Sequence, residues 1–146
     1  MKQFIFLALI VFFISCDNKD KNDLPRCLVD NFFEIYETKG ANDALDNIFQ
    51  TNEYMIKQSQ SDIETLKESL FSHLNSVGNY HGYEIISEYQ IGKSIMHYCC
   101  LVKYDIQPVR FNFVFYKSSD SWVLQNFNFD NNFITELNEM AKYHYF

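Results

Sequence analysis

Six polar side chains from residue 73 onward carry the chemistry for proton transfer. A histidine and a carboxylate that face each other in an apolar cavity can exchange a proton, because burial shifts the pKa of both groups toward neutral pH. The candidates are His97, Tyr98, Asp105 and Arg110 on expected strands, and His73 and His81 near the preceding helix. Their spacing does not show that any two of them face each other, and such histidines more often face solvent or make structural hydrogen bonds. We therefore assign no catalytic residue from the sequence.

Metal sites and nucleophilic centres have less support. The four histidines, at positions 73, 81, 97 and 144, lack the HxxxH or HxH spacing of ligand pairs. Cys99-Cys100 is not the CxxC pair of tetrahedral zinc sites. No GxSxG passage marks a nucleophilic serine. We expect no metal site and no cofactor.

The start of the chain has the pattern of an export and anchoring signal. Residues 1–15 combine a basic residue, Lys2, with an apolar run of 11 residues at 4–14. That run is too short for a membrane-spanning helix, which needs about 20 residues. Phe13-Ile14-Ser15-Cys16 resembles a bacterial lipobox, in which the cysteine is lipidated and becomes the new N-terminus, although the lipobox usually has an aliphatic residue in place of Phe13. The alternative for Cys16 is an ordinary cysteine in an uncleaved or differently cleaved signal.

Residues 16–23 are expected to form a lipidated tether, because residues 17–23 are all polar. A flexible segment of this length spans roughly 15 Å. The chain has 12 basic and 19 acidic residues and a net charge of -7. This balance disfavours a nucleic-acid partner, because clustered Lys and Arg drive phosphate binding. An acidic domain gains nothing from anionic lipids, so the N-terminal lipid is its expected link to the membrane of a bacterial cell envelope.

Three cysteines remain after Cys16. An exported domain meets oxidising conditions, so Cys27 could form a disulfide with one of the adjacent pair Cys99 and Cys100. Neighbouring strand residues point to opposite faces, and Cys100 belongs to the more apolar series, so Cys100 is the better partner. The alternative is three thiols that pack as small apolar residues.

Periodic apolar residues predict two helices near the start of the domain. The first covers Leu24–Thr38 and ends at Gly40, and the second covers Asn42–Gln50 with Asn42 as its cap. Each has one apolar stripe, so each is expected to cover something larger than itself.

A third helix is expected over Ser61–Val77. Ser61 and Glu64 have the spacing of a capping box, and Gly78 follows the last periodic residue. Residues 54–55 are then expected to lie in the connection that precedes this helix.

Four strands are expected after the helices, because alternating apolar residues are separated by short turn segments. The predicted strands are Tyr83–Gln90, Ser94–Asp105, Val109–Lys117 and Trp122–Phe129. Short connections predict an antiparallel sheet. Phe111, Phe113 and Phe115 share one face, which we expect to be buried, and Arg110 is expected on the solvated face. Residues 132–146 have the potential for a short C-terminal helix.

Helices followed by a curled antiparallel sheet make an α+β fold. From Leu24 to Phe129 the chain resembles the nuclear-transport-factor-two-like superfamily, which includes ketosteroid isomerase. The resemblance rests on Gly78-Asn79-Tyr80-His81-Gly82-Tyr83-Glu84 before the sheet and on the closing passage Phe115-Tyr116-Lys117…Trp122-Val123-Leu124…Phe127. It implies a cone-like domain with a pocket between helices and sheet. The alternative is another helix-on-sheet arrangement, such as a cystatin-like fold.

These observations favour a single domain at 24–146 in a membrane-anchored lipoprotein without catalytic activity. The expected partner is a small apolar or amphiphilic ligand or another envelope protein. An isomerase- or dehydratase-type enzyme with a His–carboxylate pair in its pocket is the alternative. A third hypothesis is an assembly role, in which an edge strand or the C-terminal segment docks a partner by strand addition. Four tyrosines could line a ligand cleft or pack in the core and its rim: Tyr80, Tyr83, Tyr89 and Tyr104.

Overall fold

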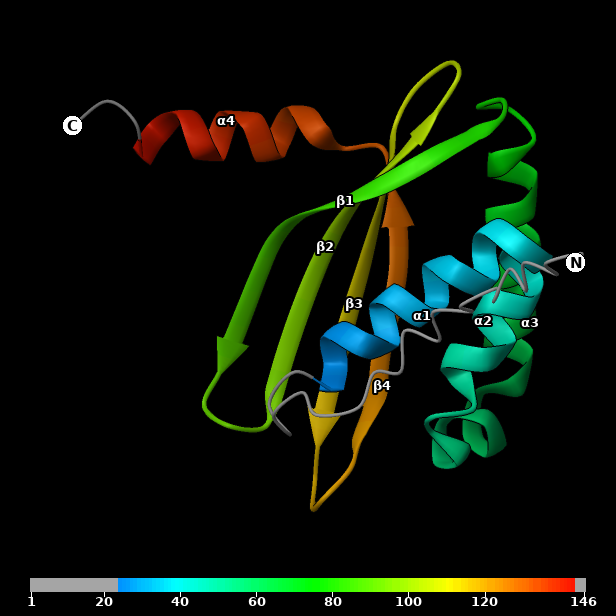
Figure 1. Ribbon diagram of the computed structural model, residues 1–146, viewed down its shortest axis with the longest axis vertical. Coiled ribbons are helices and arrows are strands. Elements are labelled where there is room, and N and C mark those ends of the chain that lie inside the picture. The colour runs from blue at the N-terminus through cyan, green and yellow to red at the C-terminus, as the bar shows by residue number, and fades with distance from the viewer. Residues whose placement is uncertain (1–23, 144–146) are drawn as a thin grey trace, which may run out of the picture.

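The computed structural model describes residues 24–143 (Figure 1). The predicted signal at 1–15, the tether at 16–23 with Cys16, and residues 144–146 lie outside this part of the chain. The elements in chain order are α1 (Leu24–Lys39), α2 (Ala41–Phe49), α3 (Glu53–Leu74), β1 (Tyr80–Ile91), β2 (Ile95–Tyr104), β3 (Val109–Lys117), β4 (Trp122–Asp130) and α4 (Phe133–Tyr143).

These elements form the predicted α+β fold. The strands pair in the order β1-β2-β3-β4, and every pairing is antiparallel. The sheet is curved and open, with α1 across one of its faces and α2 and α3 beyond it (Figure 1). α4 follows β4 and projects away from the other three helices.

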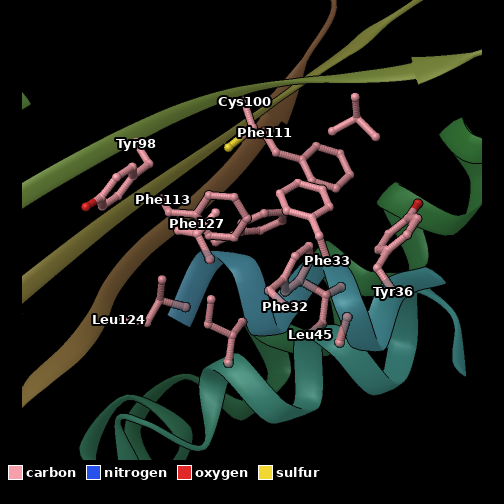
Figure 2. Close-up of a cluster of buried hydrophobic side chains, with 14 of the residues drawn as sticks. Phe32, Phe33, Tyr36, Leu45, Tyr98, Cys100, Phe111, Phe113, Leu124 and Phe127 are labelled. Carbon is pink, nitrogen blue, oxygen red and sulfur yellow. The ribbon is translucent and has the colours of Figure 1, made fainter. Parts of the chain in front are cut away.

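The core lies between α1 and the sheet (Figure 2). Phe111, Phe113 and Phe115 are fully buried, as their alternation predicts. The ring centroid of Phe32 on α1 lies 5.1 Å from that of Phe113 and 6.0 Å from that of Phe127 on β4. Aromatic side chains therefore fill the space between helix and sheet where the resemblance implies a pocket.

A single glycine joins α1 to α2. Gly40 N donates to Tyr36 O at 3.0 Å, and Gly40 O accepts from Ala44 N at 3.2 Å. Gly40 has a φ of +96°, a conformation that favours glycine. Its backbone starts α2 directly, without a side-chain cap. The predicted cap, Asn42, is therefore wrong, because Asn42 lies inside the first turn of α2.

α3 begins earlier than predicted. Its cap is Asn52, whose Oδ1 accepts from Met55 N at 3.0 Å, so residues 54–55 belong to the first turn and not to a connection. The predicted start at Ser61 lies shortly after a kink at Ser59, where φ is -130° and ψ is 29°. The helix ends at Leu74, ahead of the predicted end. The capping-box pattern thus coincides with the point where the helix resumes after its kink.

An inserted residue changes which side chains of β1 face the helices. The register between β1 and β2 shifts at Ile86, which forms a β-bulge. Beyond the bulge, Glu88 lies opposite Tyr98, and Tyr98 Oη donates to Glu88 Oε1 at 3.3 Å. Glu88 Oε2 is 4.0 Å from Nη1 of Arg26 in the first turn of α1. The start of α1 therefore lies beside the second half of β1.

Candidate binding site

A hollow of about 430 Å³ lies between α3 and β4, which we call the α3–β4 hollow. It is lined by Asp62, Thr65, Leu66, Ser69, Asn128 and Phe129. The four α3 residues are spaced three and four apart, so they share one face of the helix. The two β4 residues are neighbours that point to opposite faces of the sheet, so the hollow runs along the edge of the strand. β4 is the last strand of the sheet, and none of the strands between residues 24 and 143 neighbours this edge.

Near the start of β4, side chains of the α2–α3 turn form hydrogen bonds with the backbone at the edge of the strand. Leu124 N donates to Thr51 Oγ1 at 3.0 Å, and Asn52 Nδ2 donates to Leu124 O at 2.8 Å. The turn between α2 and α3 therefore takes the place of a neighbouring strand at Leu124. The α3–β4 hollow opens further along the same edge.

The lining of the hollow suits a ligand that is part apolar and part hydrogen-bonding. Leu66 and Phe129 are half-buried and offer apolar surface, whereas Asp62 and Ser69 are exposed polar groups. His73 stands at one end, with its ring centroid 5.7 Å from that of Phe129. Two other hollows, of about 340 and 240 Å³, are lined mainly by polar and charged side chains of α1, α2 and α3. The α3–β4 hollow thus combines an apolar lining with an open strand edge.

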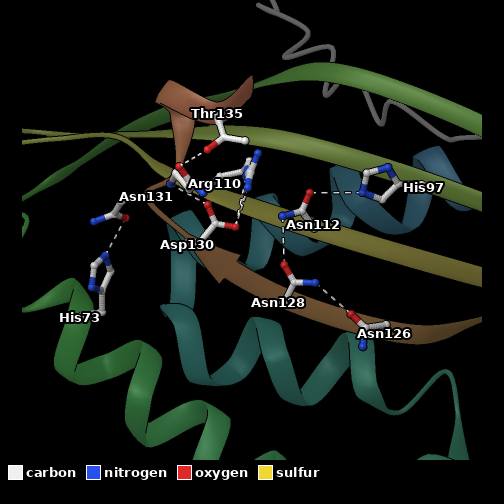
Figure 3. Close-up of polar contacts among 10 residues, drawn as sticks. His73, His97, Arg110, Asn112, Asn126, Asn128, Asp130, Asn131 and Thr135 are labelled. Atoms are coloured by element: carbon white, nitrogen blue, oxygen red, sulfur yellow. Dashed lines mark hydrogen bonds and ion pairs between the residues drawn. The ribbon is translucent and has the colours of Figure 1, made fainter. Parts of the chain in front are cut away.

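A ladder of side chains holds Asn128 at the hollow (Figure 3). His97 Nε2 lies 3.2 Å from Asn112 Oδ1, Asn112 Nδ2 donates to Asn128 Oδ1 at 3.0 Å, and Asn128 Nδ2 donates to Asn126 Oδ1 at 3.1 Å. The ladder crosses β2, β3 and β4 on the face away from α1. His97 therefore has the structural, hydrogen-bonded role that was the alternative to catalysis.

Two other candidates from the sequence, His73 and Arg110, lie around this ladder. His73 Nε2 is 2.9 Å from Asn131 Oδ1. Arg110 is on the predicted face, opposite the buried Phe residues, where an ion pair covers most of it: its side chain is 16% exposed and its Nη2 is 2.9 Å from Asp130 Oδ2. Asp130 Oδ1 also accepts from Asn132 N at 2.7 Å, which fixes the connection to α4.

The structure brings together one histidine and one carboxylate of the candidate set. His81 Nε2 is 2.5 Å from Asp105 Oδ1, and Asp105 Oδ2 accepts from Asn79 N at 2.7 Å. The amide of Asn79 and the ring of His81 hold the pKa of the Asp105 carboxyl below its usual value. Both side chains are exposed. The pair ties the residue that follows β2 to the start of β1 and does not line the α3–β4 hollow.

Most of the four tyrosines pack against the core. Tyr83 stacks on Phe33 with centroids 3.7 Å apart, and its Oη donates to Asp30 Oδ1 at 2.9 Å. Tyr104 shares a hydrogen bond with Tyr36 on α1. Burial raises the pKa of Tyr80 to about 12. These tyrosines therefore have the packing role that was the alternative to a ligand cleft, and Tyr89 is exposed.

Cys100 faces the core, as its apolar neighbours predict, and burial raises the pKa of its thiol. The structure does not join Cys27 and Cys100 by a disulfide, and the bridge stays a prediction. In the part of the chain that the structure describes, no group of three or more His, Cys, Asp and Glu side chains is placed to hold a metal ion. Between residues 24 and 143, no helix has the length and apolar character needed to cross a bilayer.

Comparison of the chain with family models, curated proteins and solved structures found no match. The resemblance to the nuclear-transport-factor-two-like superfamily therefore stays a prediction. The function has to be inferred from the geometry of the domain and from the N-terminal sequence.

Proposed function

We propose that this chain is a lipoprotein of a bacterial cell envelope whose domain binds an extended segment of a neighbouring protein in the α3–β4 hollow, without catalysis. The observation that carries the proposal is the hollow beside an edge of β4 that no other strand in the described part of the chain covers. An exposed strand edge offers backbone groups that an added strand can pair with. Apolar side chains of such a segment would contact Leu66 and Phe129, and its polar groups would meet Asn128 and Ser69.

The filled interior supports a surface site over an internal one. Phe32 and Phe33 of α1 pack against Phe111 and Phe113 of β3, and all four are buried. None of the buried residues that the structure describes is polar or charged. The α3–β4 hollow, in contrast, is already lined by hydrogen-bonding groups that a partner could use.

A photoreactive residue in the hollow tests this proposal. With a benzoylphenylalanine in place of Ser69, the full chain is expected to form a discrete protein adduct in the cells that produce it. The matched control is Phe71, a 59% exposed residue on the opposite face of the same helix that does not line the hollow. A second change, Thr65→Arg, fills the hollow with a long side chain and is expected to remove the adduct at position 69. Equal adducts at positions 69 and 71, or an adduct at position 69 that survives Thr65→Arg, would contradict the proposal.

Lipidation of Cys16 is tested by a separate experiment, because this part of the proposal rests on the N-terminal sequence alone. The intact mass of the membrane-extracted protein is expected to exceed that of the chain from Cys16 onward by the mass of acyl chains and a glyceryl group. Cys16→Ser is expected to remove this increase, and Cys27→Ser is expected to keep it. An unmodified chain would contradict the lipoprotein proposal while leaving the binding proposal open to its own test.

A small amphiphilic molecule is the second candidate occupant, because the volume of the hollow is within the range of small-ligand sites, roughly 300–1,000 Å³. Native mass spectrometry of the purified protein distinguishes the two occupants. A bound small molecule that Thr65→Arg displaces would favour the small ligand over the protein segment. The isomerase- or dehydratase-type alternative needs an enclosed His–carboxylate pair, and His81 and Asp105 are paired at the surface.

A further inference from the structure

Exposed apolar side chains gather at the end of the sheet that holds the β1–β2 and β3–β4 turns. Tyr89 and Ile91 on β1 are 65% and 69% exposed, and Tyr116 on β3 is also exposed. Ile91 pairs with Ile95 on β2, and Ile95 pairs with Tyr116 on β3. The side chains of Ile91, Ile95 and Tyr116 therefore form one row across the face of the sheet away from α1. We call Tyr89, Ile91 and Tyr116, with the nearby Lys93 and Lys117, the hairpin end.

The composition of the hairpin end is typical of surfaces that rest in a membrane interface. Tyrosine is enriched at the level of the lipid headgroups, because its ring is apolar and its hydroxyl is polar. Lysine side chains extend from such surfaces toward the headgroups. Lys93 is exposed in the β1–β2 turn, and Lys117 Nζ lies 6.0 Å from the centre of the Trp122 ring. Asp120 adds one negative charge in the other turn, so apolar contact would dominate over electrostatic attraction.

The chain also enters the domain at this end. Arg26, in the first turn of α1, lies 4.0 Å from Glu88, and Glu88 is three residues before Ile91 on β1. Three residues of a strand rise about 10 Å. In Figure 1 the start of α1 and both turns of the hairpin end lie on the same side of the domain, opposite the β2–β3 connection. The described part of the chain therefore begins at the end of the sheet that carries the exposed apolar row, on the other face of the sheet, and a tether over residues 17–23 would span roughly 15 Å from there.

We infer that the hairpin end contacts the surface of the lipid bilayer when Cys16 is lipidated. This inference rests on the proposed lipoprotein, because the tether supplies the proximity that a few exposed side chains lack by themselves. The acyl chains hold the domain near the bilayer, and insertion of Ile91 and the two tyrosines into the interface fixes its orientation.

Quenching by brominated lipid tests the orientation. The full lipidated chain with Ile91→Trp is reconstituted into phosphatidylcholine vesicles brominated on the upper part of one acyl chain. The matched control is Ile106→Trp in the β2–β3 connection, because Ile106 is 72% exposed and lies at the opposite end of the sheet. After subtraction of the signal of Trp122 in the parent protein, we expect the fluorescence of position 91 to be quenched about twofold or more relative to position 106.

Tyr89→Trp provides a second probe at the same end and is expected to follow Ile91→Trp. Equal quenching at positions 91 and 106 in a chain whose mass shows acylation would overturn this inference and leave the proposed lipoprotein intact. An unacylated chain with no quenching at either position would overturn both. Stronger quenching at position 106 would place the opposite end of the domain at the membrane.

Discussion

Phe113→Ala is expected to lower the free energy of unfolding by about 3–5 kcal/mol. The Phe113 ring is 0% exposed, and its centroid lies 5.1 Å from those of both Phe32 and Phe127. Removing it leaves a cavity where α1, β3 and β4 meet, and the packed rings around it relax only in part. Because a domain of this kind is stable by roughly 5–15 kcal/mol, this change removes a large share of its stability.

Urea denaturation followed by circular dichroism measures this loss. The control is Tyr116→Ala, which removes an aromatic ring from the same strand on its exposed face and is expected to cost about 1 kcal/mol or less. Equal losses for the two variants would mean that the α1 face of the sheet does not contain the main core.

Gly78→Ala is expected to destabilise the domain more than Gly40→Ala, although both glycines have a positive φ, of +92° and +96°. An added Cβ at Gly78 would lie 2.7 Å from Asp105 Cβ and 2.8 Å from Asp105 Oδ2, so the Asp105 side chain would have to move. An added Cβ at Gly40 meets nothing within 4 Å. Gly40 has a ψ of 175° at this positive φ, so Gly40→Ala reports the cost of the backbone conformation alone, roughly 1–3 kcal/mol, and the excess at Gly78 reports the contacts of Asp105.

The additional loss of stability in Gly78→Ala, relative to Gly40→Ala, is also expected to depend on pH. The pKa of the Asp105 carboxyl is lowered in the folded state, chiefly by the Asn79 amide and then by His81. A lowered folded pKa gives stability that is present above the unfolded pKa, near 4, and is lost as the pH falls through the folded value. The difference between the two alanine variants should therefore narrow in acid. A difference that stays constant from neutral pH to acid would assign the excess to steric strain.

The sequence predicts the elements of this fold well where a single segment determines them. β3 has the predicted bounds, Val109–Lys117, because alternating Phe residues and flanking turns mark both ends. The start of α3 was missed because its cap, Asn52, is one of several polar residues there, and its position also depends on a hydrogen bond to Leu124 on β4. Contacts of this kind depend on tertiary structure and leave no local pattern.

The candidate site was less predictable for the same reason. Leu66 lies in an expected helix and Asn128 in an expected strand, but nothing local indicates that they line one hollow. Arg110 was placed on the correct face, yet its ion pair with Asp130 depends on the register of β3 and β4. His81 and Asp105 were candidates for chemistry, and only the fold shows that they meet outside the core.

The length of β4 sets a distance between the two proposed contacts of the domain. The strand runs from Trp122, next to the hairpin end, to Asp130, and Asn128 lies near its far end. Six residue steps along a strand rise about 20 Å. If the hairpin end contacts the bilayer, β4 acts as a rigid spacer that holds the α3–β4 hollow about 20 Å from the contacting end of the domain. A tether over residues 17–23, as the sequence predicts, would then limit how far the domain moves from the bilayer, and the sheet would determine how far above the lipid headgroups the domain meets a partner.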